Sequence, residues 1–168
     1  AVEALGAPPP PPEPLRVTAP VVVALGASEA RAEPGEERFD VAIEFDHPAI
    51  GAQRWVGGPA DYAGLAAART FGLLSEADAL RARGLVRGAS LEHAIVFADD
   101  GPLRPLRFPD EPVRHKALDA LGDLALLGRP LRAHVTLRRG SHALHHALMS
   151  SLLSTRATSR DGGPGEAP

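Results

Sequence analysis

The chain contains no cysteine, which excludes disulfide bonds and thiolate metal sites. It also lacks an apolar run long enough to span a bilayer, and its start lacks a basic segment, so the sequence predicts neither a membrane span nor a signal peptide. Positive charge is not in excess: the formal net charge is -3 at pH 7, which argues against a nucleic-acid partner. The 168 residues suit one domain with a hydrophobic core.

Lysine is nearly absent, because Lys116 is the one lysine and the remaining Lys/Arg positions are arginines. An ammonium and a guanidinium are not interchangeable in a binding site. A single lysine next to His115 therefore indicates a position that requires an ammonium, although chance would produce the same pattern.

Glycine and proline are abundant, at 17 residues each, and much of this excess lies at the two ends of the chain and in loops. Residues 1–14 include the run Pro8 to Pro12 and are predicted to be a polyproline II linker. Residues 15–153 are predicted to form the folded domain. Residues 154–168 are small, polar and rich in Gly and Pro, and are predicted to be disordered. The start at Ala1 rather than methionine hints at a fragment or a processed product.

Mixed strand and helix patterns predict an α+β fold, a two-layer sandwich with helices on one face of a β-sheet. Phe39, Val41, Ile43 and Phe45 alternate with polar residues, as is typical of a half-buried strand. Further strands are predicted at 15–17, 20–25, 53–56, 94–97 and 132–137, with a short extended piece at 106–108. Helices are predicted at 60–68, 75–83, 108–127 and 142–153, the last one capped by Ser141. A loop is predicted at 26–37 and a corner at 69–72.

The helix predicted at 108–127 carries a polar ridge beside a broad apolar face. Asp110 or Glu111 is expected to cap its start, and His115, Asp119 and Asp123 recur every four residues along one side. The plainer interpretation of this ridge is a solvated face with a His–Asp pair. The alternative is a metal ridge, because a His and an Asp one turn apart can reach the same divalent ion while a further carboxylate holds a nearby histidine. The spacing alone leaves both interpretations open.

Five motifs, in order along the chain, resemble one family. They read IEFDHPAI (43–50), ARTFG (68–72), GASLEHAIV (88–96), LRFPDE (106–111) and VRHKALDALGD (113–123). In these motifs the sequence is similar to UDP-3-O-acyl-N-acetylglucosamine deacetylase, the zinc amidase of lipid A biosynthesis. The resemblance runs from about Leu15 to Leu153 and covers only the second of the family's two domains.

The resemblance implies a cytoplasmic hydrolase that removes the N-acetyl group of a UDP-linked, 3-O-acylated glucosamine. His115 and Asp119 match two of the family's three zinc ligands, and these donors would also suit Fe²⁺. His142 matches the catalytic histidine, Asp123 the aspartate that orients it, and Thr70 the hydroxyl donor to the oxyanion. Without the resemblance, His142 is a histidine at a capped helix start and Thr70 is a turn threonine.

The resemblance also implies a substrate site. Lys116 and Arg139 match positions that meet the glucosamine and phosphate groups, with Arg in place of the more usual Lys at 139. Phe45, with Glu44 beside it, matches the nucleotide contact, although a phenylalanine at a strand end is often core. An insert at about 71–101 matches a βαβ unit that lines an apolar passage for the acyl chain, whose leucines are otherwise simply core.

Several features depart from the family. We expect this sequence to lack the family's first domain, which carries one zinc-ligand histidine and the general-base glutamate, and residues 1–6 resemble the end of that domain. Ser141 replaces a glycine, His145-His146 replaces an Asn-Asn pair, and a nucleotide-holding lysine expected at 28–33 is absent.

Two hypotheses follow. One is a deacetylase half-site that needs the first domain in cis or in trans; the other is a non-catalytic remnant that serves at most as a ligand-binding module. His142, His145 and His146 are also spaced to bind a metal by themselves, although a solvated histidine cluster is the plainer account.

Overall fold

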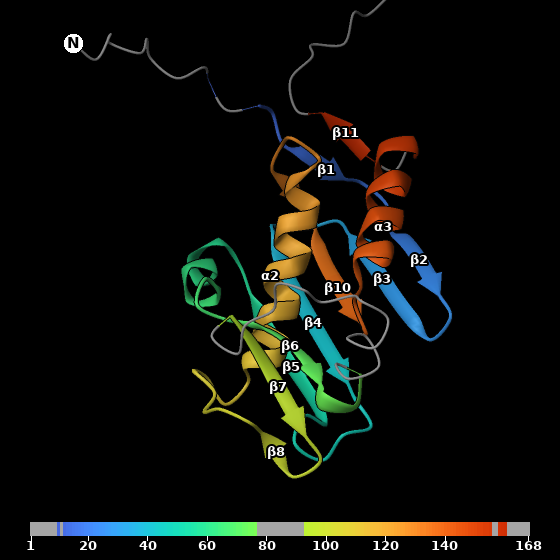
Figure 1. Cartoon of the computed structure of the whole chain (residues 1–168). Helices are drawn as coiled ribbons and strands as arrows, with labels where there is room; N and C mark the ends of the chain where they lie inside the picture. The colour runs from blue at the N-terminus through green and yellow to red at the C-terminus, as the bar shows by residue number, and fades with distance from the viewer. Residues whose placement is uncertain (1–9, 11, 77–92, 156–157, 161–168) are drawn as a thin grey trace, which may run out of the picture.

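The computed structural model describes residue 10 and residues 12–76, 93–155 and 158–160. Its largest element is a five-stranded sheet in the order β2-β3-β10-β4-β5 (Figure 1). The strands are β2 (Val21–Leu25), β3 (Ser28–Glu33), β4 (Arg38–Glu44), β5 (Ala52–Gly57) and β10 (His134–Arg138). Neighbouring strands are antiparallel, except that β10 runs parallel to β4.

Strand β3 corrects the loop predicted at 26–37. Its Ala30 and Ala32 are fully buried, and they pair with valines of β2 on one side and with Leu137 and Val135 of β10 on the other. Alanine has a low strand propensity, and here it alternates with charged residues, so the local pattern favours a loop. Pairing with a strand on each side outweighs that local preference.

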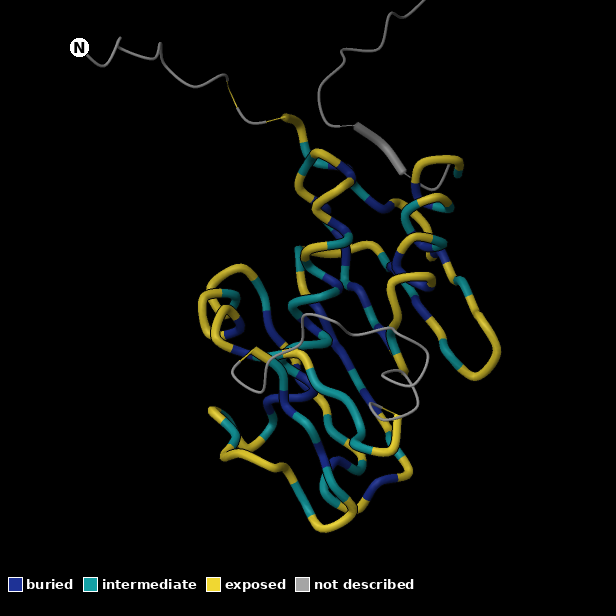
Figure 2. The backbone as a smooth tube through the Cα atoms, viewed as in Figure 1, coloured by how far each residue is buried: buried dark blue, intermediate teal, exposed yellow. Residues whose placement is uncertain are grey.

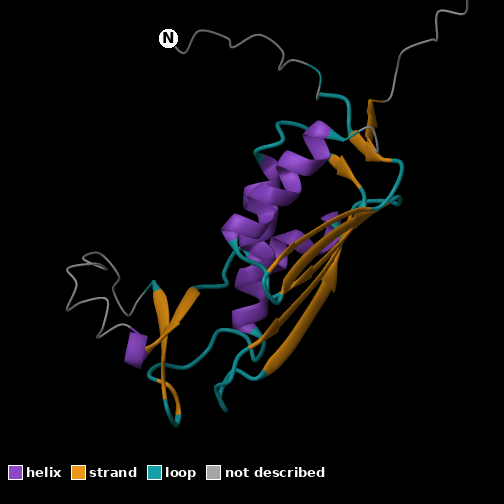
Figure 3. Cartoon of the chain, turned by 90° about the vertical axis from the view of Figure 1, so that its right-hand side faces the viewer, coloured by secondary structure: helices purple, strands orange, loops and turns teal. Residues whose placement is uncertain are grey.

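Two helices, α2 (Glu111–Ala125) and α3 (His142–Ser154), lie on one face of this sheet (Figure 3). The core forms where they meet the strands, and Figure 2 shows buried stretches in the central strands. The residues that the helices bury in it include Val113, Ala117, Ala120, Leu124, Leu144, Leu148 and Leu152. The α+β fold class predicted from the sequence is confirmed. None of the helices in the described ranges is long and apolar enough to cross a membrane.

The ends of the two helices are set by local features. Gly128, with φ of +70°, follows α2 in the left-handed conformation that glycine tolerates. The Asp110 side chain does not cap α2, because it accepts a hydrogen bond from Arg114 Nε at 2.7 Å instead. Ser141 caps α3 as predicted, since its Oγ accepts from the Leu144 N–H at 3.3 Å.

A second sheet, β6-β7-β8, lies beside the N-terminal end of α2 (Figure 1). Its strands are β6 (Thr70–Leu73), β7 (Ala94–Ala98) and β8 (Gly101–Pro102), so the corner predicted at 69–72 is wrong. Strands β6 and β7 are parallel, as the two strands of the predicted βαβ insert would be. Residues 74–76 are helical, and residues 77–92, with most of the helix predicted at 75–83, lie outside the described residues.

A third sheet, β11-β1-β9, consists of β1 (Leu15–Val17), β9 (Leu131–Arg132) and β11 (Thr158–Arg160). Strand β11 belongs to the segment predicted to be disordered, and its pairing with β1 is a difference from that prediction. The helix predicted at 60–68 is a 3₁₀ helix, η1 (Pro59–Leu65), and residues 106–108 join no strand. The linker predicted at 1–14 lies mostly outside the described residues.

Candidate active site

The ridge of α2 carries the candidate metal ligands and the candidate orienting aspartate. His115, Asp119 and Asp123 lie one turn apart, and their side chains are 17%, 16% and 15% exposed. At one end the ridge meets the segment around Ala68, and at the other end it meets α3. The ridge is therefore covered at both ends and is largely buried, whereas the plainer interpretation predicts a solvated face.

His115 is held by two contacts. Its Nδ1 lies 3.2 Å from the Ala68 carbonyl oxygen, and its Nε2 lies 3.2 Å from Asp119 Oδ1. A carbonyl oxygen only accepts, so Nδ1 carries a proton and donates it. In the neutral imidazole, Nε2 then presents its lone pair toward Asp119, which is the form that a metal ion binds.

Charges on the ridge shift both partners. Burial lowers the pKa of His115, but the hydrogen bond and the charge of Asp119 outweigh it, so the net shift is upward. Burial raises the pKa of Asp119, and His115 and Lys116 together bring it below its usual value. Lys116 contributes because its Nζ lies 3.4 Å from Asp119 Oδ2. Without a metal ion, the pair is therefore stabilised in its charged state.

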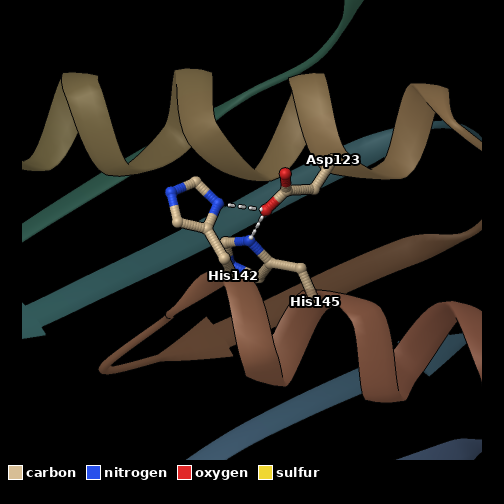
Figure 4. Close-up of side chains that lie close together, drawn as sticks. All are labelled: Asp123, His142 and His145. Carbon is tan, nitrogen blue, oxygen red and sulfur yellow. Dashed lines mark hydrogen bonds and ion pairs between the residues drawn. The ribbon is translucent and has the colours of Figure 1, made fainter.

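Asp123 joins α2 to two histidines of α3. Its Oδ2 lies 2.7 Å from His142 Nδ1 and 2.8 Å from His145 Nδ1 (Figure 4). The side chain of His142 is 64% exposed and that of His145 only 1%. His146 is more distant, with Nε2 3.9 Å from Asp123 Oδ1. The structure thus brings His142 and Asp123 together and adds His145, which the sequence analysis treated as a departure.

The three side chains also form a possible second donor set. One ligand atom each of Asp123, His142 and His145 lies within 4.8 Å of the others, close enough for one metal ion. Hydrogen bonds from both histidines to Asp123 explain the same arrangement without an ion. Burial raises the pKa of Asp123, but these hydrogen bonds bring it below its usual value. Burial lowers the pKa of His145, and Asp123 offsets this only in part.

The four candidate substrate residues line one cavity of about 230 Å³. Its walls are Ile43, Glu44, Phe45, Lys116, Arg139 and Gly140. Arg139 Nη2 donates to Glu44 Oε2 at 2.6 Å, and the hydrogen bond and charge of Arg139 lower the pKa of Glu44. Arg139 has a φ of 53°, a left-handed conformation that is uncommon for a residue other than glycine. Phe45 packs edge-on to Phe71 at 5.3 Å between ring centroids, so it has a core contact as well.

Thr70 has fewer contacts with the candidate site than the residues above. It begins β6, is exposed, and pairs through its backbone with Ala94. It follows Ala68 by two residues, so it lies on the same segment whose carbonyl orients His115.

Sequence reasoning missed the buried residue that holds the segment at Ala68 and Arg69 in place. Glu111 is fully buried and accepts from the backbone and guanidinium of Arg69 and from the Arg107 N–H. The sequence analysis assigned Glu111 to helix capping. No local sequence pattern indicates the pairing of Glu111 with Arg69, because the two residues are 42 positions apart in the chain.

Comparison with known proteins identifies the family. A sequence model of UDP-3-O-acyl N-acetylglycosamine deacetylase (LpxC) matches residues 7–154. The chain belongs to this family. Curated relatives carry the name UDP-3-O-acyl-N-acetylglucosamine deacetylase. The protein from Solibacter usitatus is 48% identical over 124 residues, which are 70% of this chain and 42% of that protein. The one from Wolinella succinogenes is 44% identical over 145 residues, 83% and 49% of the two chains.

The deacetylase of Myxococcus xanthus is similar as well, at 43% identity over 150 residues, which are 86% of this chain and 48% of that protein. The chain spans about half the length of the curated relatives that it matches. The membership confirms the resemblance inferred from the five motifs.

The donors of His115 and Asp119 fit a divalent ion of the zinc type. Two ligands about 2.1 Å from a tetrahedral zinc ion lie roughly 3.4 Å from each other. His115 Nε2 and Asp119 Oδ1 are 3.2 Å apart, and the Ala68 carbonyl accepts the Nδ1 proton of His115, so loss of the Nε2 proton leaves a lone pair there for an ion. The pair can thus accept an ion after small side-chain movements.

Proposed function

We propose that this chain carries part of the active site of a metal-dependent deacetylase that removes the N-acetyl group of UDP-3-O-acyl-N-acetylglucosamine in lipid A biosynthesis. The observation that carries the proposal is the geometry of one helix ridge. His115 and Asp119 face each other across 3.2 Å, and one turn later Asp123 holds His142. Family membership supports the substrate class and a cytoplasmic reaction.

In this proposal His115 and Asp119 hold a Zn²⁺ ion, or Fe²⁺, which the same donors suit. When bound, such an ion brings the pKa of a coordinated water to about 7. Ala68 supports the site by accepting the Nδ1 proton of His115, which leaves Nε2 for the ion.

His142 acts as the proton carrier. Because Asp123 accepts from Nδ1, the other ring nitrogen of this exposed side chain is the one that meets substrate. In its protonated form, His142 Nε2 stabilises the oxyanion and donates a proton to the leaving amine. The Thr70 hydroxyl supplies a further donor to the oxyanion.

The cavity beside the ridge binds the glucosamine and nucleotide part of the substrate. Lys116 and Arg139 supply positive charge for phosphate, while Phe45 and Glu44 meet the nucleotide. Lys116 links this cavity to the ridge, because its Nζ lies 3.4 Å from Asp119 Oδ2. The insert at about 71–101, of which residues 77–92 lie outside the described residues, would line the passage for the acyl chain.

A third metal ligand and a general base complete the site. In this proposal the family's first domain supplies a histidine and a glutamate, in cis or in trans. The chain alone therefore binds Zn²⁺ weakly and turns over little.

Complementation tests the proposal. The purified chain, with Zn²⁺ and UDP-3-O-acyl-N-acetylglucosamine, is mixed with the N-terminal half of the Wolinella succinogenes relative, and acetate release is measured. We expect release only when both are present, and we expect His115→Ala to abolish it. Leu126→Ala is the control, since Leu126 is 72% exposed and its side chain belongs to neither the metal site nor the contacts of the Asp123 carboxylate. No acetate from two folded proteins with zinc present contradicts the proposal.

The second candidate is a non-catalytic module that binds the nucleotide sugar. The residues that depart from the family at Ser141, His145 and His146 favour it. It predicts that the chain binds UDP, with binding weakened by Arg139→Ala, but that complementation never yields acetate.

A further inference from the structure

We propose that His145 is a positioning residue, which holds the Asp123 carboxylate in the orientation that His142 requires. The inference rests on the proposed function, because it concerns the same aspartate–histidine pair. It assigns a role to a side chain that otherwise reads as a buried histidine of the core.

The first observation is that two imidazoles converge on one oxygen. His142 Nδ1 and His145 Nδ1 lie 2.7 Å and 2.8 Å from the same Asp123 Oδ2 (Figure 4). The two histidines are three residues apart on α3, so adjacent turns of one helix present both rings to α2. A pair between Asp123 and the exposed His142 alone would be weakly held, because solvent competes for both partners.

The second observation is the position of the proton on His145. Its Nε2 is buried and has no hydrogen-bond partner among the described residues. A proton on Nε2 would therefore be a buried, unsatisfied donor, and the bare Nδ1 would face a carboxylate oxygen. The Nδ1–H tautomer avoids both costs, so His145 is a donor to Asp123.

The side chain of His145 is enclosed by protein. The side chain is 1% exposed, and burial lowers its pKa. The charged or titratable groups that face it are Asp123 and Asp119 on α2 and His142 on α3, with His146 beside Asp123. Both the Nδ1–H neutral ring and the imidazolium donate from Nδ1, so the bond from His145 to Asp123 rests on the 2.8 Å geometry and not on the charge of His145.

The third observation concerns Gly140. A Cβ built on Gly140 would lie 2.9 Å from His145 Nε2, closer than real Cβ atoms approach. The absence of a side chain at 140 therefore makes the space that the ring occupies. Gly140 also lines the cavity with Lys116 and Arg139, so the ring of His145 is placed by the same loop that shapes the candidate substrate site.

The tautomer of His145 is measured directly on the unmodified chain. Long-range ¹H–¹⁵N spectra distinguish a protonated from a bare nitrogen in each ring. We expect Nδ1 of His145 to carry the proton and Nε2 to be bare. A His145 protonated on Nε2 alone overturns the proposal, because it cannot donate to Asp123.

Two variants test the positioning role. His145→Leu removes the donor but keeps an apolar side chain in the buried space. His145→Asn keeps a donor, because the amide nitrogen of Asn occupies the branch position of His Nδ1. With circular dichroism confirming the fold, we expect His142 to lose its Nδ1–H tautomer in His145→Leu and to retain it in His145→Asn.

These spectra do not depend on turnover. If His145→Leu leaves the His142 tautomer unchanged in a folded chain, or if His145→Asn loses it as fully as His145→Leu does, the positioning role is wrong. If His145→Leu does not fold, loss of the His142 Nδ1–H tautomer in His145→Asn, or an Nε2–H tautomer of His145 in the unmodified chain, still overturns the role. Failure of the acetate assay with the expected spectra would reject the proposed function alone.

Discussion

Glu111 and Arg69 form a buried ion pair that ties the start of α2 to the segment preceding β6. Glu111 Oε1 accepts from Arg69 Nε at 2.9 Å and from the Arg69 N–H at 3.0 Å, and Oε2 accepts from Arg69 Nη2 at 3.1 Å. The Arg107 N–H adds a bond to Oε2 at 2.6 Å. Ala68, the residue before Arg69, carries the carbonyl that orients His115. By holding Arg69, the pair therefore also fixes the position of the Ala68 carbonyl beside His115.

Glu111→Gln removes the carboxylate charge and leaves the Arg69 guanidinium, 10% exposed, without a counter-charge. Losing one partner of a buried ion pair lowers the free energy of unfolding by about 3–5 kcal/mol. Urea unfolding followed by circular dichroism measures this change. Asp110→Asn is the matched control, because its pair with Arg114 is partly exposed and contributes little. Equal effects of the two substitutions would contradict the expectation.

Acid should lower the free energy of unfolding by protonating Glu111. Burial raises the pKa of Glu111, but the hydrogen bonds from Arg69 and Arg107 outweigh it and lower the pKa from 4.5 to about 2. A carboxyl group with a depressed folded-state pKa stabilises the fold above its unfolded pKa, and this contribution is lost as pH falls from about 4.5 toward 2. The shift corresponds to about 3 kcal/mol.

The measurement is the difference in unfolding free energy between the unmodified chain and Glu111→Gln, taken at several pH values. We expect the difference to be full near pH 6 and to shrink as the solution approaches pH 2. A difference that does not change over this range would show that the charge of Glu111 is not what stabilises the fold.

Metal binding distinguishes the two donor sets. His115→Ala and Asp119→Asn are each expected to weaken Zn²⁺ binding by roughly tenfold or more, because loss of a coordination bond costs well over about 1.4 kcal/mol. Competition with a chromophoric chelator measures the affinity. Leu126→Ala serves as the control, because Leu126 is exposed and has no group that binds metal. If His142→Ala lowers the affinity and His115→Ala does not, the ion binds at Asp123, His142 and His145 instead.

Arg139→Gly should stabilise the fold while it weakens ligand binding. The φ of 53° at Arg139 is one that glycine adopts freely, and relief of this conformation contributes about 1 kcal/mol. The same change removes a positive charge from the cavity, so the affinity for UDP should fall. Arg138→Gly is the control, because Arg138 lies within β10, where glycine destabilises by about 0.5–1 kcal/mol. Thermal unfolding and calorimetric UDP titration give the two readouts.

Gly140→Ala should disturb the Asp123 cluster, because the new Cβ would lie 2.9 Å from His145 Nε2. We expect a lower melting temperature and altered ring resonances of His145. Gly122→Ala is the matched control: apart from its own helix backbone and chain neighbours, no atom of the described residues lies within 4 Å of its built Cβ, and alanine in a helix is favoured by about 1 kcal/mol over glycine. A higher melting temperature of Gly140→Ala would contradict this expectation, because it would mean that the loop moves to make room for the Cβ.

Features that depend on neighbouring residues were predictable from the sequence. The helical period placed His115, Asp119 and Asp123 on one ridge, and Gly128 and Ser141 marked helix ends that the structure confirms. The motifs were enough to recognise the family, because they contain contiguous residues in a fixed order. These signals are local, so they survive without knowledge of the fold.

Only the tertiary structure decided which distant residues meet. Strand β3 exists because β2 and β10 flank it, and Glu111 is an ion-pair partner because Arg69 reaches it from 42 residues away. His145 contacts Asp123 because α3 packs beside α2, so a position that looked like a departure from the family lies within the candidate site. The physical reason is common to all three: pairing, desolvation and shared hydrogen-bond acceptors depend on what surrounds a side chain, and the sequence alone determines only what stands next to it along the chain.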